Sequence, residues 1–107
     1  MKDDHMNEAA AQRFARYREI VLEIISRNLP HCKVYLFGSR ARGTNQPGAD
    51  IDLALDCGSP IDFHIILKLH DEIEETTMPL TVDLVDLYSA SDTLKNEVKK
   101  EGILWES

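Results

Sequence analysis

Long apolar runs, basic residues and cysteines are all scarce in this chain of 107 residues. No stretch approaches the roughly 18 apolar residues that span a bilayer, which argues against a transmembrane helix. Residues 1–7 are polar and lack the apolar centre of a secretory signal, so we expect a cytoplasmic location. The hydrophobic fraction of 43% is ordinary for a folded protein, and the length suits one domain with one core.

Acidic residues outnumber basic ones by 19 to 12, which gives a formal net charge of −7. This excess argues against direct, sequence-independent binding of nucleic acid, because such binding depends on Lys and Arg neutralising phosphates. A partner with a basic surface suits the chain better, since complementary charge steers association. An enzyme that acts on nucleotides remains compatible if metal ions lie between its carboxylates and the substrate phosphates.

The two cysteines, Cys32 and Cys57, match none of the spacings typical of metal sites. In the reducing compartment expected for this chain, thiols are normally kept reduced. We therefore predict that both are free thiols rather than a disulfide.

The spacing of apolar residues predicts a single domain, 1–107, of α/β (α+β) class with the order α-β-α-β-α-β-α. A helix is expected over about 8–28 and another over about 90–101, around a core at about 33–88. We expect strands at 33–37, 50–56 and 81–87. By themselves these elements imply a small mixed sheet of three to four strands with helices packed on it.

Short polar motifs predict where the later helices begin and end. Ser59, followed by Pro60 and by Asp62 three residues after the serine, resembles an N-cap with proline in the first helical position. Ser89 with Asp92 resembles a second capping box. Gly102 suits the position just after the last helix, where a left-handed residue is common.

A glycine-containing turn follows the first expected strand directly: Gly38-Ser39-Arg40-Ala41-Arg42-Gly43. Glycine lets a phosphate approach the backbone without a clash at Cβ, and amides at a helix start attract anionic oxygens. The Ser39 hydroxyl could donate to a phosphate oxygen. The same residues are also typical of a plain strand-to-helix turn, so this pattern alone leaves both interpretations open.

Two aspartates, Asp50 and Asp52, stand two apart on the next expected strand and therefore project from the same face. Carboxylates this close raise one another's pKa unless a cation lies between them. Mg²⁺ prefers oxygen ligands and commonly joins carboxylates to substrate phosphates. An exposed acidic strand face is the alternative, and the apolar residues Ile51 and Leu53 weaken it because they already supply a buried face.

The third expected strand offers one further acid to this pair. Asp83 and Asp86 are an odd number of residues apart, so they face opposite sides of the strand. We choose Asp83, because it lies within the strand whereas Asp86 lies near its end. Asp86, and Asp56 at the end of the preceding strand, are interpreted as solvated or capping residues.

These motifs together resemble a known signature. LFGSRARG followed by ADIDLAL is similar to the DNA polymerase beta-like nucleotidyltransferase superfamily, which has a Gly-Ser turn, paired aspartates on the next strand and a third aspartate on a later strand. Within it, the chain most resembles the minimal nucleotidyltransferases, and the resemblance covers about 34–87. Ala49 departs from the serine that often precedes the first aspartate, at a position that is not a metal ligand.

The resemblance implies a metal-dependent reaction. Asp50, Asp52 and Asp83 would ligate two Mg²⁺ ions, and Asp83 could accept the proton of the attacking hydroxyl. Two such ions stabilise the entering and leaving oxygens of an in-line displacement at phosphorus.

The resemblance also implies a cradle for the triphosphate of ATP. Gly38 and Ser39 would hold the phosphates, and Arg40 and Arg42 would neutralise part of their charge. For at least one of the two arginines, a solvated position on a short helix is an equally good interpretation.

Stand-alone minimal nucleotidyltransferases resemble the antitoxins of HEPN/MNT toxin–antitoxin systems. The resemblance therefore implies a hetero-oligomer with a HEPN toxin, often an RNase, and transfer of AMP from ATP to a tyrosine hydroxyl of that toxin. One alternative is a non-catalytic antitoxin that acts by complex formation, which the complete aspartate set disfavours. Another is an enzyme acting on a small-molecule hydroxyl such as an aminoglycoside, which usually needs more acceptor-binding surface than this chain offers.

Overall fold

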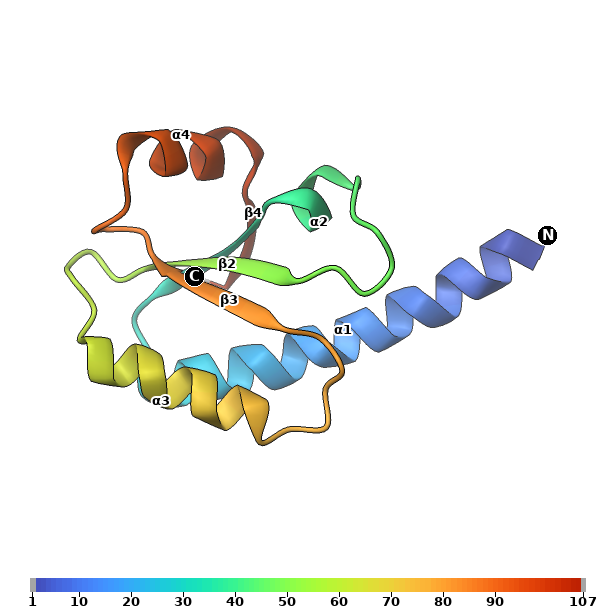
Figure 1. Ribbon diagram of the computed structural model, residues 1–107, viewed down its shortest axis with the longest axis horizontal. Coiled ribbons are helices and arrows are strands. Elements are labelled where there is room, and N and C mark those ends of the chain that lie inside the picture. Colours follow the sequence, from blue (N-terminus) through green and yellow to red (C-terminus); the bar gives the residue numbers. More distant parts are fainter. Residues whose placement is uncertain (1, 107) are drawn as a thin grey trace.

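The computed structural model describes the backbone of residues 2–106 and the side chains of residues 8–105. Helices and strands alternate along the chain (Figure 1). Their bounds are α1 (Lys2–Asn28), β1 (Lys33–Phe37), α2 (Ser39–Arg42), β2 (Ile51–Asp56), α3 (Phe63–Glu74), β3 (Val82–Asp86), α4 (Asp92–Glu101) and β4 (Ile103–Glu106). Within this described part, no helix combines the length and apolar character that crossing a membrane requires.

One mixed sheet organises the molecule, with the strand order β3-β2-β1-β4. β1 runs antiparallel to both β2 and β4, whereas β2 and β3 run parallel. Helices α1 and α3 lie side by side against one face, and α4 lies on the other (Figure 1). The predicted class, a small mixed sheet with helices packed on it, is confirmed.

Alternation along the strands divides the apolar side chains between two cores. The larger core lies between the sheet, α1 and α3, and its buried members are Val21, Ile24, Ile25, Val34, Leu36, Ile51, Leu53, Leu55, Leu69, Ile73, Val82 and Trp105. The smaller core lies under α4 and is built on Phe37, Ala54 and Val98. Because residues two apart share a face, this division also fixes the face of every polar residue between them.

The strand predictions hold to within one residue at each end, but the last strand, β4, was not predicted. Its sequence is only four residues long and follows α4 without a turn motif. Trp105 is buried in the larger core, which explains why this segment adds to the sheet. The N-terminal helix is longer than predicted and begins at Lys2 rather than near residue 8.

The predicted start of α3 at Ser59 is wrong. The helix begins at Phe63, and Asp62 is its N-cap, with a carboxylate oxygen that accepts from the backbone N–H of His64 at 2.8 Å. Just before the helix, the carboxylate of Asp86 at the end of β3 accepts from the backbone N–H of Ile61 at 3.0 Å. That contact holds the residues after β2 as a loop.

The predicted caps of α4 are also wrong. Ser91 is the N-cap and accepts from the N–H of Leu94, whereas the hydroxyl of Ser89 donates to Asp86 at 3.0 Å. At the other end, Gly102 has an extended conformation with φ −66° instead of the left-handed one, because the chain passes directly into β4.

A disulfide joins Cys32 to Cys57, so the prediction of free thiols is wrong. The register of the antiparallel pair β1–β2 places Lys33 opposite Asp56, which brings the residues just outside the two strands together. Their Cα atoms are 4.2 Å apart although 25 positions separate them in the sequence. Cysteine spacing alone does not reveal such a pair, because it appears only once the register is known.

We predict that reduction of this disulfide lowers the free energy of unfolding by about 2–4 kcal/mol, because the bond closes a long loop in the unfolded chain. Chemical denaturation with and without a thiol reductant measures this. The matched control is Cys57→Ala, whose stability should not respond to the reductant. Equal stability of the wild-type chain in both buffers would contradict the prediction.

Candidate active site

The alternation along β2 and β3 decides which acids meet. Ile51 and Leu53 are fully buried in the larger core, so Asp52 between them lies on the face that α4 partly covers. The residues flanking Asp83 on β3 pack against the same larger core, and Asp83 therefore lies on the face of Asp52. The register of the parallel pair places Asp52 and Asp83 directly beside each other.

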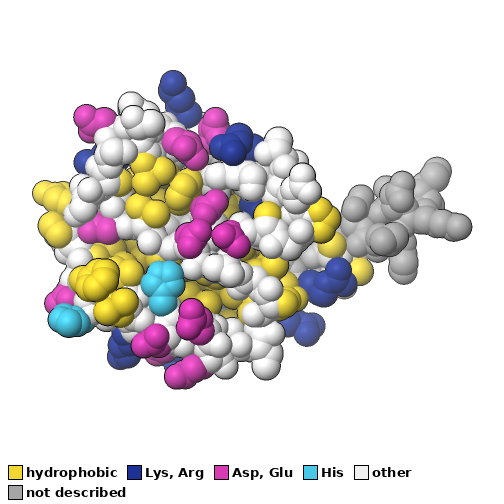
Figure 2. Space-filling model, viewed as in Figure 1, with side chains coloured by type: hydrophobic (Ala, Val, Ile, Leu, Met, Phe, Trp, Pro, Cys, Tyr) yellow, Lys and Arg dark blue, Asp and Glu magenta, His cyan; other side chains and the backbone are white. Residues whose placement is uncertain are grey.

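Asp50 joins these two residues from the loop before β2. It is exposed, and the backbone after it is fixed by a hydrogen bond from the N–H of Ile51 to the carbonyl of Thr81, at 2.9 Å. Figure 2 shows acidic side chains gathered near the middle of this face, over the region where Figure 1 draws β2 and β3. The structure thus brings together the three acids that the sequence pattern selected.

The Gly38 turn lies directly against this acidic group. Gly38 follows β1 with φ +76°, a conformation that L side chains rarely adopt. A Cβ atom at this position would overlap the Oδ2 atom of Asp52. Only glycine therefore fits here, and the requirement comes from the backbone angle and from the carboxylate together. Ser39 begins α2 at once, so the turn and the acids form one site.

The electrostatics of the site centre on Asp52. Burial raises the pKa of this carboxyl above its ordinary value of 3.8, and the negative charges of Asp83 and then Asp50 raise it further. A nearby cation would stabilise the ionised form of Asp52, because its positive charge offsets the repulsion between the carboxylates. The electrostatics of the site therefore favour the binding of a cation.

The acids fit Mg²⁺ only in company with other ligands. Among the described residues, no three His, Cys, Asp or Glu side chains converge tightly enough to hold a metal ion by themselves. Mg²⁺ usually takes one or two carboxylates and completes its coordination with water and substrate phosphates. Asp50, Asp52 and Asp83, beside the Gly38–Ser39 turn, have this chemistry. Their role as ligands remains a prediction.

The two arginines of α2 make protein contacts of different kinds. The guanidinium of Arg40 donates from Nε and Nη2 to the carbonyl oxygen of Ala49, at 3.0 and 2.8 Å. Arg42 instead forms ion pairs with Glu101 at 3.1 Å and with Glu97 at 3.7 Å, which tie α2 to α4. That either arginine also neutralises triphosphate charge remains a prediction.

Asp86 lies apart from the three acids, on the opposite face of β3. Its carboxylate accepts from the backbone N–H groups of Ile61 and Tyr88 and from the hydroxyl of Ser89, at 3.0, 3.2 and 3.0 Å. Asp56 similarly accepts from the N–H of Gly58 at 3.2 Å. Both acids therefore organise loops, as the sequence indicated.

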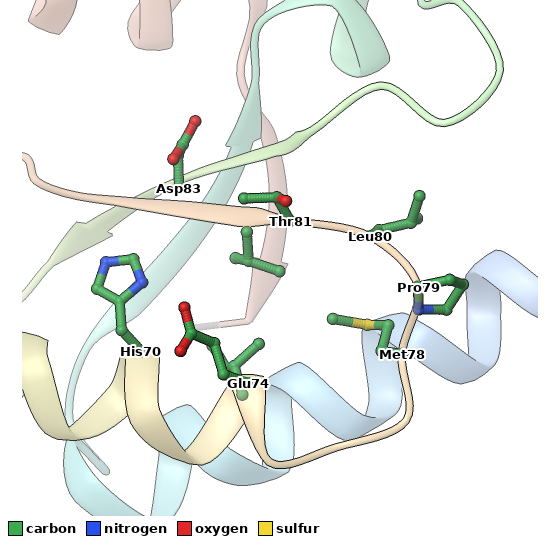
Figure 3. A pocket seen from close by; sticks show the side chains of 9 residues that line it. His70, Glu74, Met78, Pro79, Leu80, Thr81 and Asp83 are labelled. Carbon is green, nitrogen blue, oxygen red and sulfur yellow. The ribbon is translucent and has the colours of Figure 1, made fainter.

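A pocket of about 480 Å³ borders the site along the outer edge of β3. Figure 3 shows His70 and Glu74 pointing from α3 toward β3, whereas the carboxylate of Asp83 points away from α3. Apolar side chains of the linking loop, Met78 and Leu80 among them, complete the lining. No pattern in the sequence indicated this pocket, because only the packing of α3 beside β3 creates it.

We predict that Asp83→Asn removes activity, whereas Asp86→Asn lowers stability. Asp83→Asn should abolish Mg²⁺-dependent nucleotidyl transfer without lowering the unfolding temperature, because Asp83 makes the site and not the fold. Asp86→Asn should lower stability by about 1–3 kcal/mol, because it weakens the hydrogen bonds that Asp86 accepts. Thermal unfolding and a transfer assay on both variants measure this. Loss of transfer in a well-folded Asp86→Asn protein would show that the assignment of faces is wrong.

Comparison with known proteins agrees with this geometry. Residues 19–105 match the family described as Polymerase beta, Nucleotidyltransferase. The probable protein adenylyltransferase MntA of Haemophilus influenzae is 32% identical over 81 residues, which cover 76% of this chain and 71% of that protein.

Two solved structures are also similar. One is a toxin–antitoxin with AMP-PNP, with a TM-score of 0.71 and 30% identity over 82% of this chain and 71% of the other. The second is the tri-AMPylated HEPN toxin of Shewanella oneidensis in complex with its MNT antitoxin, with a TM-score of 0.67 and 27% identity over 85% and 70% of the two chains. With its sequence matched over most of its length and its Gly-Ser turn and aspartates in place, the chain belongs to the polymerase beta nucleotidyltransferase family.

Proposed function

We propose that this chain is an antitoxin that transfers AMP from ATP to a tyrosine hydroxyl of a partner HEPN toxin, with Mg²⁺ bound by Asp50, Asp52 and Asp83. The observation that carries the proposal is the contact between the Gly38 turn and Asp52, beside Asp83. A phosphate cradle and a carboxylate cluster that touch can hold a nucleotide and its metal ions at once. The related protein from Haemophilus influenzae, a probable protein adenylyltransferase, supports the choice of reaction.

The chemistry proposed for the site is an in-line displacement at the α-phosphorus of ATP. The tyrosine oxygen forms a bond to this phosphorus, the bond to the bridging oxygen breaks, and pyrophosphate leaves. The Gly38–Ser39 turn holds the triphosphate, and Asp83 accepts the proton of the tyrosine hydroxyl. When bound, Mg²⁺ supplies positive charge that stabilises the entering and leaving oxygens.

The acceptor in this proposal comes from a docked protein. Asp83 lies exposed on β3, an edge strand, and its carboxylate points away from α3 (Figure 3). A macromolecule that covers this edge could deliver a hydroxyl to Asp83 and exclude water from the reaction. The tri-AMPylated toxin bound to its antitoxin in Shewanella oneidensis supports a toxin as the acceptor. The net charge of −7 favours a partner with a basic face.

The direct test is the intact mass of the partner toxin after incubation with this chain, ATP and Mg²⁺. We predict that the mass rises by whole AMP groups, that the modified residue is a tyrosine, and that chelation of Mg²⁺ prevents the change. The double variant Asp50→Asn/Asp52→Asn should leave the toxin unmodified. Asp71→Asn, which removes an acid from the exposed surface of α3, is the matched control and should modify it fully.

Two outcomes would contradict the proposal. A toxin that stays unmodified, yet is neutralised by the double variant, would show that complex formation alone suffices. Transfer of AMP to an aminoglycoside but to no protein would assign the site to a small-molecule acceptor instead.

A further inference from the structure

We propose that Arg40 is a positioning residue, which holds the backbone before Asp50 so that this carboxylate stays at the metal site. The inference rests on the proposed function, because it assumes that Asp50 binds Mg²⁺. It differs from the role that sequence resemblance suggests for Arg40, which is to neutralise triphosphate charge. The difference follows from where the guanidinium lies and from what it contacts.

Arg40 makes two hydrogen bonds to one atom, the carbonyl oxygen of Ala49, from Nε at 3.0 Å and from Nη2 at 2.8 Å. Both bonds are partly buried and charge-assisted, a combination that is stronger and more directional than a neutral hydrogen bond. Ala49 is the residue immediately before Asp50. The guanidinium therefore fixes the peptide group from which the Asp50 side chain is displayed.

The backbone around Asp50 is held at two points. On the far side, the N–H of Ile51 donates to the carbonyl of Thr81 at 2.9 Å, which secures the start of β2 against β3. On the near side, a tight turn with Gly48 at φ +80° ends in a bond from the N–H of Ala49 to Gln46. That bond closes the turn locally, and the bonds from Arg40 to Ala49 join the last residue of the turn to α2.

Packing does not replace this connection. A pocket of about 440 Å³ lies between α1 and the turn, and Arg40, Phe14, Pro47 and Gly48 are among its lining residues. Arg40 crosses this space with its guanidinium 4.9 Å from the ring centre of Phe14, a cation–π contact. Phe14 in turn packs edge-on against buried Trp105, 5.8 Å between ring centres. A chain of contacts thus links the Asp50 turn to α1 and the core.

The substitution Arg40→Lys distinguishes a positioning role of Arg40 from a role in neutralising phosphate charge. It keeps the positive charge, but it lacks the fork of donors and the flat face that stacks on Phe14. If Arg40 positions Asp50, Arg40→Lys should weaken the response to Mg²⁺, and saturating Mg²⁺ should restore nucleotide affinity. If Arg40 only neutralises phosphate charge, Arg40→Lys should behave like the wild type at every Mg²⁺ concentration.

The test is calorimetric titration of the full chain with AMP-PNP at increasing Mg²⁺ concentrations, with thermal unfolding as a check of folding. For Arg40→Lys we expect the Mg²⁺ concentration at half-saturation to rise about 10-fold, the lower end of what loss of an outer-shell partner costs. Phe14→Leu, which removes the aromatic face but keeps an apolar side chain, should shift the same quantity in the same direction and by less.

Arg18→Lys is the matched control. Arg18 also donates to a backbone carbonyl, that of Trp105 at 3.1 Å, and its guanidinium lies 5.3 Å from the ring centre of the same tryptophan. Among the described residues, no hydrogen bond or ion pair joins Arg18 to the Asp50 turn, so its Mg²⁺ response should equal that of the wild type. A folded Arg40→Lys protein with an unchanged Mg²⁺ half-saturation would overturn the inference. A wild-type chain that binds AMP-PNP without any response to Mg²⁺ would overturn the proposed function, and this inference with it.

Discussion

Repulsion among carboxylates is the constraint on which the rest of this structure depends. The parallel register of β2 and β3 places Asp52 beside Asp83, and Asp50 adds a third charge from the preceding loop. No fold gains stability from such crowding, because each ionised carboxylate opposes the next. The pKa of Asp52 is raised first by its partial burial and then by the neighbouring negative charges. The surrounding elements have to hold the acids together against this repulsion.

Several features of the fold serve this purpose. Fully buried Ile51 and Leu53 fix the face of Asp52, and the smaller core under α4 begins only two residues farther along the strand, at Ala54. Gly38 allows the turn after β1 to lie against the carboxylate, and Arg40 secures the loop before Asp50. The same arrangement concentrates negative charge beside the Gly38 turn, where Mg²⁺ that accompanies a nucleotide would bring positive charge. Under the proposed function, the instability of the acidic cluster and the affinity for a metal–nucleotide complex would have a common origin.

Much of this could be predicted from the sequence, because alternation and motif spacing are local properties. The alternation of side chains along a strand predicted that Asp83 and Asp86 lie on opposite faces. In the structure, the residues that flank Asp83 pack into the larger core, so Asp83 itself lies on the other face. The Gly-Ser turn and the aspartate pair were likewise visible as patterns. Their use in binding metal and nucleotide stays a prediction that awaits the measurements described above.

The features that could not be predicted all depend on contacts between distant segments. Cys32 pairs with Cys57 only because of the β1–β2 register. The start of α3 differs from the prediction, and the segment before it is bound to Asp86, 25 positions from Ile61, through the N–H of Ile61. The pocket beside Asp83 needs α3 to lie along β3, and the contact of Arg40 with Ala49 needs the loop to fold back on α2. The spacing of residues along the sequence does not reveal these contacts between distant segments.

The central claim is that Asp52 is held at an electrostatic cost to the fold, and the unfolding temperature as a function of pH tests it most directly. Because the pKa of Asp52 is raised above 3.8, the folded state binds this proton more tightly than the unfolded state does. The wild-type chain therefore loses stability relative to Asp52→Asn as pH rises through the raised pKa. The account predicts that Asp52→Asn is the more stable protein at neutral pH, and that its advantage shrinks as pH falls toward 3.8. An Asp52→Asn protein that is less stable than the wild type at neutral pH would contradict it.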